Sequence, residues 1–297
     1  MAQIKIQDLL GAGVHFGHQT KRWNPKMKPY VYGAKNGISI IDLTKTMYQI
    51  AEASNYLSKV VAEGGNVLFV GTKRQAQEII KDAADKTNMN YVSERWLGGT
   101  LTNIRTIRQS VKKMDELDKI LAENTVGEDG VKKGKLKKKE ISKHTRNSDK
   151  LHRNLDGIKN MKNMPQVLVV VDVCNDSIAV QEARKLNIPV IGICDTNADP
   201  ELVTYPIAAN DDAVKSIKVI IDVLVETVSD ANEIYQKKVI EEKAKKEAAR
   251  AKKKEEKEAA RAKKKDEKDA KKAPAKKAPA KKAPAKKAAP KKAEEAK

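Results

Sequence analysis

The chain has 297 residues, a formal net charge of +20 and only 4% aromatic residues. Residues 241–297 contain 24 Lys and Arg against 11 Asp and Glu, which leaves a net charge of +7 on residues 1–240. The sequence has no signal-peptide core and no apolar run approaching the ~20 residues of a membrane span, so we expect a cytoplasmic protein without a membrane partner. The charge favours a polyanionic partner, but it does not distinguish RNA from DNA or anionic lipid.

A basic and aromatic arm is predicted over residues 1–36. Residues 13–29 contain two prolines, two histidines, four cations and a tryptophan, in an order that no helix or strand period explains. Cations that meet phosphates, beside rings that stack on bases, are what irregular RNA surfaces recognise. The alternative is a basic loop that its tryptophan anchors to the core. The residues of the arm predicted to bind RNA are Arg22, Trp23, Lys26, Lys28 and Tyr30.

Apolar strands alternate with amphipathic helices over residues 37–101 and 164–232. Runs such as 188–194 are apolar throughout, as strands are when both faces of a parallel sheet are covered. Between these runs, apolar residues at three- and four-residue spacing predict helices. A loop with two prolines is expected over residues 195–210. We predict an α/β core domain with helices on both faces of the sheet.

Two segments depart from this alternation. Residues 102–163 have the pattern of two long, polar amphipathic helices around a turn, which predicts an inserted antiparallel helical hairpin that docks on another molecule. Residues 233–297 form a Lys/Ala/Pro-rich tail, predicted to be helical and then disordered because a proline recurs in every pentad from residue 271.

A strand, a glycine turn and a helix start meet at residues 69–76. The first amides of that helix, with Thr72, Lys73 and Arg74, could hold a phosphate. The segment lacks the second glycine and the Gly-Lys-Ser/Thr ending of a nucleotide-binding P-loop. We therefore predict that Lys73 and Arg74 contact an RNA phosphate, and the alternative is ordinary capping of a surface helix.

Acidic residues follow the apolar strands of the second half. Asp172 and Asp195 lie at predicted carboxyl ends, where open α/β sheets bind ligands, and more aspartates follow. We expect these aspartates to cap helices and order turns, and we predict no cofactor. The candidate ligands for a structural Mg²⁺ or Zn²⁺ ion would be His18, Asp195 and Asp211.

A second dense stretch runs from Arg95 to Arg108. Gly98 and Gly99 allow close backbone approach to a partner, a threonine at 100 or 102 is expected to cap the next helix, and Trp96 is expected to be buried. The predicted RNA contacts in this connector are Arg95, Arg105 and Arg108.

Several ordered motifs resemble the bacterial ribosomal protein S2 family. They are Gly11-Ala-Gly-Val-His-Phe-Gly-His-Gln-Thr20, Trp23-Asn-Pro-Lys-Met-Lys-Pro-Tyr30, Phe69-Val-Gly-Thr-Lys73, Arg95-Trp-Leu-Gly-Gly-Thr-Leu-Thr-Asn103, Gly157-Ile-Lys159 and Ile193-Cys-Asp-Thr-Asn-Ala-Asp-Pro200. The resemblance covers residues 1–230 and implies a flavodoxin-like domain with an inserted hairpin. It further implies binding of 16S ribosomal RNA between the head and body of the small subunit and a role in docking ribosomal protein S1. The tail lies outside the resemblance.

These observations predict a structural, rRNA-binding constituent of the small ribosomal subunit that is not an enzyme. The alternative is a nucleotide- or metal-dependent α/β enzyme that uses the strand ends near Thr72, Asp172 and Asp195. A lysine-rich nucleoid binder is a third interpretation, which depends on the tail alone.

Overall fold

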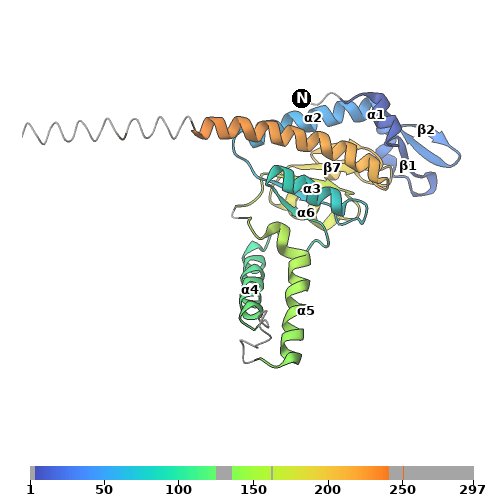
Figure 1. Cartoon of the computed structure of the whole chain (residues 1–297). Helices are drawn as coiled ribbons and strands as arrows, with labels where there is room; N and C mark the ends of the chain where they lie inside the picture. Colours follow the sequence, from blue (N-terminus) through green and yellow to red (C-terminus); the bar gives the residue numbers. More distant parts are fainter. Residues whose placement is uncertain (1–3, 125–135, 162, 241–249, 251–297) are drawn as a thin grey trace, which may run out of the picture. The chain divides into compact units, whose positions relative to one another are not determined.

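A parallel sheet of five strands forms the centre of the computed structural model (Figure 1), which describes residues 4–124, 136–161, 163–240 and 250. Its strands are β4 (Val67–Val70), β5 (Asn90–Val92), β6 (Val167–Val171), β7 (Val190–Cys194) and β8 (Tyr205–Ala208). Their order is β5-β4-β6-β7-β8, and every neighbouring pair is parallel. Counted along the chain, this is the 2-1-3-4-5 order of flavodoxin-like folds. The predicted α/β class is confirmed.

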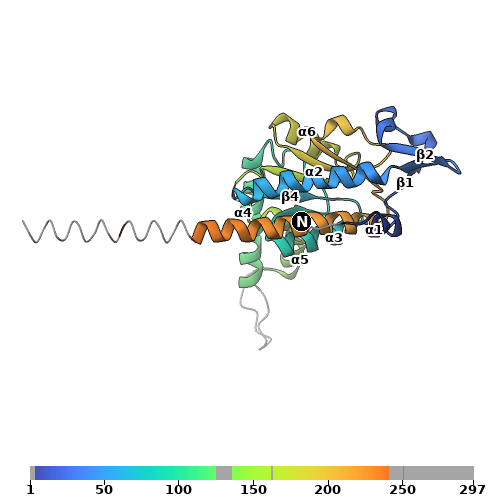
Figure 2. The same ribbon diagram turned by 90° about the horizontal axis from the view of Figure 1, so that it is seen from above.

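Helices cover both faces of this sheet, as predicted. Along β4, Val67 and Phe69 enter one apolar cluster while Leu68 and Val70 enter the other, because successive side chains of a strand point to opposite faces. The first cluster is shared with α2 (Leu43–Ala62), α3 (Gln77–Thr87) and the helix that occupies residues 214–239. That last helix, in orange, runs beside α2 in both views (Figures 1 and 2). The second cluster is shared with α6 (Ser177–Lys185) and with residues of the helical hairpin.

Strand β8 was expected to be a loop, and that expectation is wrong. Pro206 lies within the strand and pairs with Gly192 of β7. A proline cannot donate a ladder hydrogen bond, so strands that contain one are confined to sheet edges. Strand β8 is the last in the order, so one of its sides needs no donors.

The N-terminal arm contains regular structure that its sequence does not reveal. It forms α1 (Ile6–Gly11), β1 (Phe16–Gln19), the 3₁₀ turns η1 (Thr20–Arg22) and η2 (Pro25–Tyr30), and β2 (Val31–Lys35). Strands β1 and β2 flank β3 (Ile38–Ile41) in an antiparallel sheet, and both pairings carry a register shift. Such irregularities interrupt the alternation from which a strand is recognised. The strand predicted after residue 36 therefore joins the arm and not the parallel sheet.

The inserted hairpin is formed by α4 (Ile104–Glu123) and α5 (Lys138–Leu155), followed by the 3₁₀ turn η3 (Asp156–Ile158); Figure 1 shows the two helices side by side. A few apolar residues near its base, among them Ile107, Met114 and Leu155, join the second cluster. Further along, the helix pair is joined by polar groups. One carboxylate oxygen of Asp118 accepts a hydrogen bond from Ser148 at 2.8 Å and lies 2.9 Å from Nε2 of His152. His152 is held within the hairpin by these contacts and by Asp156.

This polar contact should make the stability of the hairpin depend on pH. Hydrogen bonds to Asp118 and Asp156 raise the pKa of His152 above its usual 6.5. Protonation of His152 is therefore favoured by folding, so its stabilisation is complete below about pH 6.5 and is lost as pH rises through the folded-state pKa. Amide exchange in α5 should be slower at pH 6 than at pH 8.5, after correction for intrinsic rates. His152→Gln should remove this difference and His144→Gln should retain it; the same pH dependence in both variants would contradict the prediction.

Gly157, in η3, approaches strand β5 too closely for any side chain. A Cβ added there would overlap the carbonyl oxygen and the ring of Tyr91. We expect Gly157→Ala to destabilise the protein by about 1–3 kcal/mol, because the backbone of η3 would have to move. Urea denaturation should measure the change, with Gly33→Ala as the control since nothing lies within 4 Å of a Cβ there. Equal midpoints for the two variants would show that η3 has room to shift.

The described residues between 4 and 239 form one compact unit. The predicted boundaries near residues 36, 101 and 163 thus separate segments of a single unit, and they stay predictions as domain boundaries. Nearly all of the predicted tail lies outside the described residues. Of the helices in the part that the structure describes, none is long and apolar enough to cross a membrane.

Candidate RNA-binding surface and strand-end site

The N-terminal arm is fastened to the loop that follows β7. The amide of His18 donates to Asp195 Oδ1 at 3.2 Å and to Thr196 Oγ1 at 3.0 Å. The amide of Asn24 donates to the carbonyl of Thr196 at 2.8 Å. A Cβ at Gly17 would overlap the side chain of Thr196, so this approach requires glycine. The arm is therefore positioned by backbone contacts with the carboxyl end of the sheet.

Lys26 contributes a further link between the arm and this loop. Its ammonium donates to Asp199 at 2.8 Å and to Glu201 at 2.6 Å. Both contacts are at the surface, where an ion pair contributes only about 0–1 kcal/mol. Lys26, predicted to bind phosphate, thus lies among carboxylates, and its RNA contact stays a prediction.

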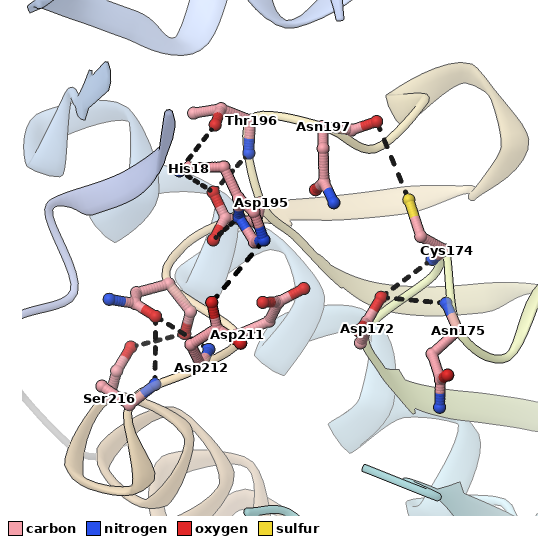
Figure 3. Close-up of polar contacts among 12 residues, drawn as sticks. His18, Asp172, Cys174, Asn175, Asp195, Thr196, Asn197, Asp211, Asp212 and Ser216 are labelled. Atoms are coloured by element: carbon pink, nitrogen blue, oxygen red, sulfur yellow. Dashed lines mark hydrogen bonds and ion pairs between the residues drawn. The ribbon is translucent and has the colours of Figure 1, made fainter. Parts of the chain in front are cut away.

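Lys73 lies at the centre of the strand-end site. Its ammonium is 2.6 Å from Asp212, 2.7 Å from Asp211 and 3.3 Å from Asp172. Lys73 follows β4, and the three aspartates follow β6 and β8, so the parallel order brings these groups to one edge of the sheet. Figure 3 labels these three aspartates at this edge of the sheet. The phosphate contact predicted for Lys73 is not tested by this geometry, but the ammonium already has anionic partners.

Burial and like charge shift the protonation of this cluster. Burial, followed by the neighbouring Asp172, raises the pKa of Asp211 to about 7, against the opposing effect of Lys73. Burial by itself would lower the pKa of Lys73, but the hydrogen bonds to Asp211 and Asp212 outweigh it, and the pKa is raised. Lys73 thus stays charged and is the internal counter-ion of the cluster.

Asp176 occupies the phosphate-like position predicted near Thr72. The amide of Thr72 donates to Asp176 Oδ2 at 3.1 Å, and its hydroxyl donates to Oδ1 at 2.8 Å. The helix predicted to start at the glycine turn begins later, since α3 starts at Gln77 and not at Lys73. The prediction that the aspartates cap helices is wrong for Asp176, whose side chain does not cap α6. Strands β4 and β6 flank the switch point of the sheet, where nucleotides bind in related architectures. In this protein the carboxylate of Asp176, and not a phosphate, accepts the hydrogen bonds of Thr72.

The three candidate metal ligands of the sequence lie together in the structure. His18 Nδ1 is 2.8 Å from Asp195 Oδ2, and Nε2 is 3.6 Å from Asp212 Oδ2 (Figure 3). One ligand atom from each of His18, Asp195, Asp211 and Asp212 lies within 4.8 Å of the others. One imidazole nitrogen with three carboxylate oxygens is a four-ligand set that suits Zn²⁺ better than Mg²⁺, which prefers six oxygen ligands. The side chain of Asn210 accepts from the amides of residues 212 and 213, just before the helix that begins at residue 214.

The remaining predicted RNA contacts lie at the surface of the arm, of the segment between β4 and α3, and of the connector. The exposed ones are Arg22, Lys28, Arg74, Arg95, Arg105 and Arg108. Trp23 is 36% exposed, whereas Tyr30 is half-buried and packs against the second apolar cluster. The exposure of these guanidinium and ammonium groups is compatible with the predicted phosphate contacts and does not test them.

Glu182 organises the connector, and its role was not predicted. One carboxylate oxygen of this α6 residue accepts from the Trp96 indole at 3.2 Å and the Gly99 amide at 2.7 Å. The other accepts from the amides of Leu101 and Thr102 at 3.0 and 3.1 Å and from the Thr102 hydroxyl at 3.1 Å. Burial would raise the pKa of Glu182, but these donors outweigh it and lower the pKa. Trp96 is buried, as expected, but Thr102 binds Glu182 and does not cap α4.

Comparison with known proteins gives a consistent assignment. The sequence model of the family described as ribosomal protein S2 matches residues 9–231. The small ribosomal subunit protein uS2 of Koribacter versatilis (strain Ellin345) is 48% identical over 241 residues, which cover 81% of this chain and 78% of that protein. The uS2 protein of Fusobacterium nucleatum subsp. nucleatum is 46% identical over 233 residues, which cover 78% of this chain and 92% of that protein. The chain therefore belongs to the ribosomal protein S2 family, and it is a structural protein of the small subunit, cytoplasmic within the ribosome, and not an enzyme.

Proposed function

We propose that this protein binds 16S ribosomal RNA between the head and body of the small subunit, through its arm, its connector and its hairpin. The observation that carries the proposal is that exposed cations of the arm and connector lie on segments held by part-buried and buried hydrogen bonds. Loop residues 195–196 hold the arm, and Glu182 holds the connector. Cations on ordered segments lose little freedom on binding, which favours recognition of a defined arrangement of phosphates.

The first test is the salt dependence of binding to small-subunit RNA. If about six phosphates are neutralised, affinity should fall by about three decades between 50 and 200 mM salt, because each contact releases condensed counterions. Filter binding with purified full-length protein would measure the slope. An affinity that does not change with salt would refute the proposal.

The second test locates the contacts. Cross-linking of the protein to RNA in purified small subunits should label residues of the arm and connector, with Trp23 or Tyr30 stacked on a base and Arg22, Lys26, Lys28, Lys73, Arg74, Arg95, Arg105 and Arg108 near phosphates. Labelling confined to residues 241–297 would instead favour the lysine-rich nucleoid binder.

We also propose that the protein helps to dock ribosomal protein S1. Membership of the S2 family supports this proposal, because the resemblance to that family implies a role in docking S1. Small subunits depleted of the chain should retain less S1 after sedimentation at moderate salt, and addition of the purified chain should restore it. Equal S1 retention with and without the chain would argue against this role.

A structural Zn²⁺ ion is proposed at His18, Asp195, Asp211 and Asp212. The convergence of these four ligand atoms supports it. An ion there would join the arm to loop residues 195–212 and add positive charge to a strongly acidic cluster. Calorimetric titration with Zn²⁺ should show stoichiometric binding that His18→Ala abolishes, with His15→Ala as the control. Unchanged Zn²⁺ binding by His18→Ala would place the ion elsewhere.

A further inference from the structure

One face of α5 carries a continuous row of positive charge. At about 100° per residue, five side chains at alternating four- and three-residue spacing fall within an arc of about 80°. Every residue within that arc is a cation. The five, called the α5 cationic row below, are Lys139, Lys143, Arg146, Lys150 and Arg153.

The row faces away from the other helix of the hairpin. The residues of α5 that are buried or half-buried, such as Ile141, Ser148 and Leu155, lie on the opposite side of the helix. All five cations are exposed, and within the described residues no ion pair between any of them and a carboxylate is found. Elsewhere in the protein, Lys26, Lys73 and Lys159 do meet carboxylates. Among the residues that the structure describes, the row therefore has no carboxylate paired with it.

The surface beside the row is hollowed. A groove is lined by Lys139, Ser142, Lys143, Arg146 and Asn147, so cations are accompanied there by a hydroxyl and an amide. From Lys139 to Arg153 the row extends for about 21 Å, with neighbouring cations about 5–6 Å apart. Like charges at this spacing repel one another within the helix, and a bound anion would reduce that repulsion.

We propose that the α5 cationic row binds the sugar–phosphate backbone of one RNA strand. The proposal rests on the rRNA binding proposed above and specifies how the hairpin takes part. A regular line of cations matches a polymer with regularly spaced negative charges. Protein partners are a poorer match, since protein interfaces have an apolar centre and the row contains no apolar or aromatic residue. For the same reason the row positions the RNA by its backbone and does not read bases.

The test compares two triple variants of the full-length protein with equal loss of charge. Lys139→Gln/Lys143→Gln/Lys150→Gln removes the lysines of the row. Lys185→Gln/Lys215→Gln/Lys218→Gln removes three exposed lysines of α6 and of the helix over residues 214–239. Each protein is titrated with protein-free 16S RNA and with small subunits lacking this chain, at several salt concentrations, after circular dichroism has confirmed equal helix content.

Loss of three phosphate contacts should weaken binding of the row variant to 16S RNA at least about tenfold at 100 mM salt and reduce the slope of log K against log salt by about two to three. The control variant should keep the slope within about one unit of the wild type. Equal slopes for the two variants, with tight wild-type binding, would overturn the role of the row and leave the proposed function intact. Weakened binding to subunits but not to RNA would overturn it in favour of a protein partner. Failure of the wild type to bind small-subunit RNA would refute the proposed function itself.

Discussion

Glu182→Ala should destabilise the protein by about 3–5 kcal/mol and disorder the connector. Its carboxylate accepts five hydrogen bonds, three of them from backbone amides that have no other partner described. Each buried donor left unsatisfied costs about 1–3 kcal/mol, and relaxation of the loop toward water limits the total. Urea denaturation would measure the loss of stability, and tryptophan fluorescence would report the exposure of Trp96.

Two further variants separate this role from a general loss of negative charge. Glu52→Ala removes an exposed glutamate of α2 and should leave the urea midpoint nearly unchanged. Glu182→Gln keeps one acceptor oxygen but places an amide group against N–H donors, so its effect should be intermediate. Because the pKa of Glu182 is lowered on folding, its stabilisation is present above its usual pKa of 4.5 and is lost as pH falls through the folded-state value. Wild-type and Glu182→Gln stabilities should therefore converge in acid; a constant difference down to pH 3 would contradict this account.

Lys73→Met should also destabilise the protein by about 3–5 kcal/mol, because it leaves Asp172, Asp211 and Asp212 without their shared cation. The adjacent Arg74→Met is the matched control, since Arg74 is exposed. We expect opposite profiles for the two variants. Lys73→Met should lower the urea midpoint, whereas Arg74→Met should keep the midpoint and weaken binding to small-subunit RNA. Equal stability of the two proteins would show that the cluster does not need its lysine.

The effect of Lys73→Met should depend on pH. The pKa of Asp211 is raised to about 7 in the folded protein from its usual 3.8, so folding favours the protonated carboxyl. This group therefore opposes folding increasingly as pH rises from about 4 to 7, and removal of Lys73 should raise its pKa further. The difference in unfolding free energy between variant and wild type should shrink between pH 8 and pH 5. A difference that grows toward acid would mean that Asp211 is ionised throughout.

Local patterns along the chain were enough to predict much of the fold. Apolar runs predicted β4, β6 and β7, since strands covered on both faces need no polar residues. Asp42 is of a residue type that commonly caps helices, and its side chain accepts from the amide of Thr44 at the start of α2. Gly64, with a φ of 87°, follows the end of that helix, where glycine is favoured. These features depend on neighbours within a few residues, which is why a linear sequence reveals them.

Contacts between distant residues decided the rest. Asp176, Thr102 and Asp211 are ordinary capping residues by sequence, yet each forms a hydrogen bond to a group that lies 80 to 138 residues away. Glu182 has no local signature, because the five donors that it binds come from another segment of the chain. From the sequence alone, the motifs of the arm and connector indicate the family. The three- and four-residue spacing of the cations in α5 places them on one face of that helix. Only the parallel sheet decided which carboxylates meet Lys73 and which loop holds the arm, because its topology brings separate strand ends to one edge.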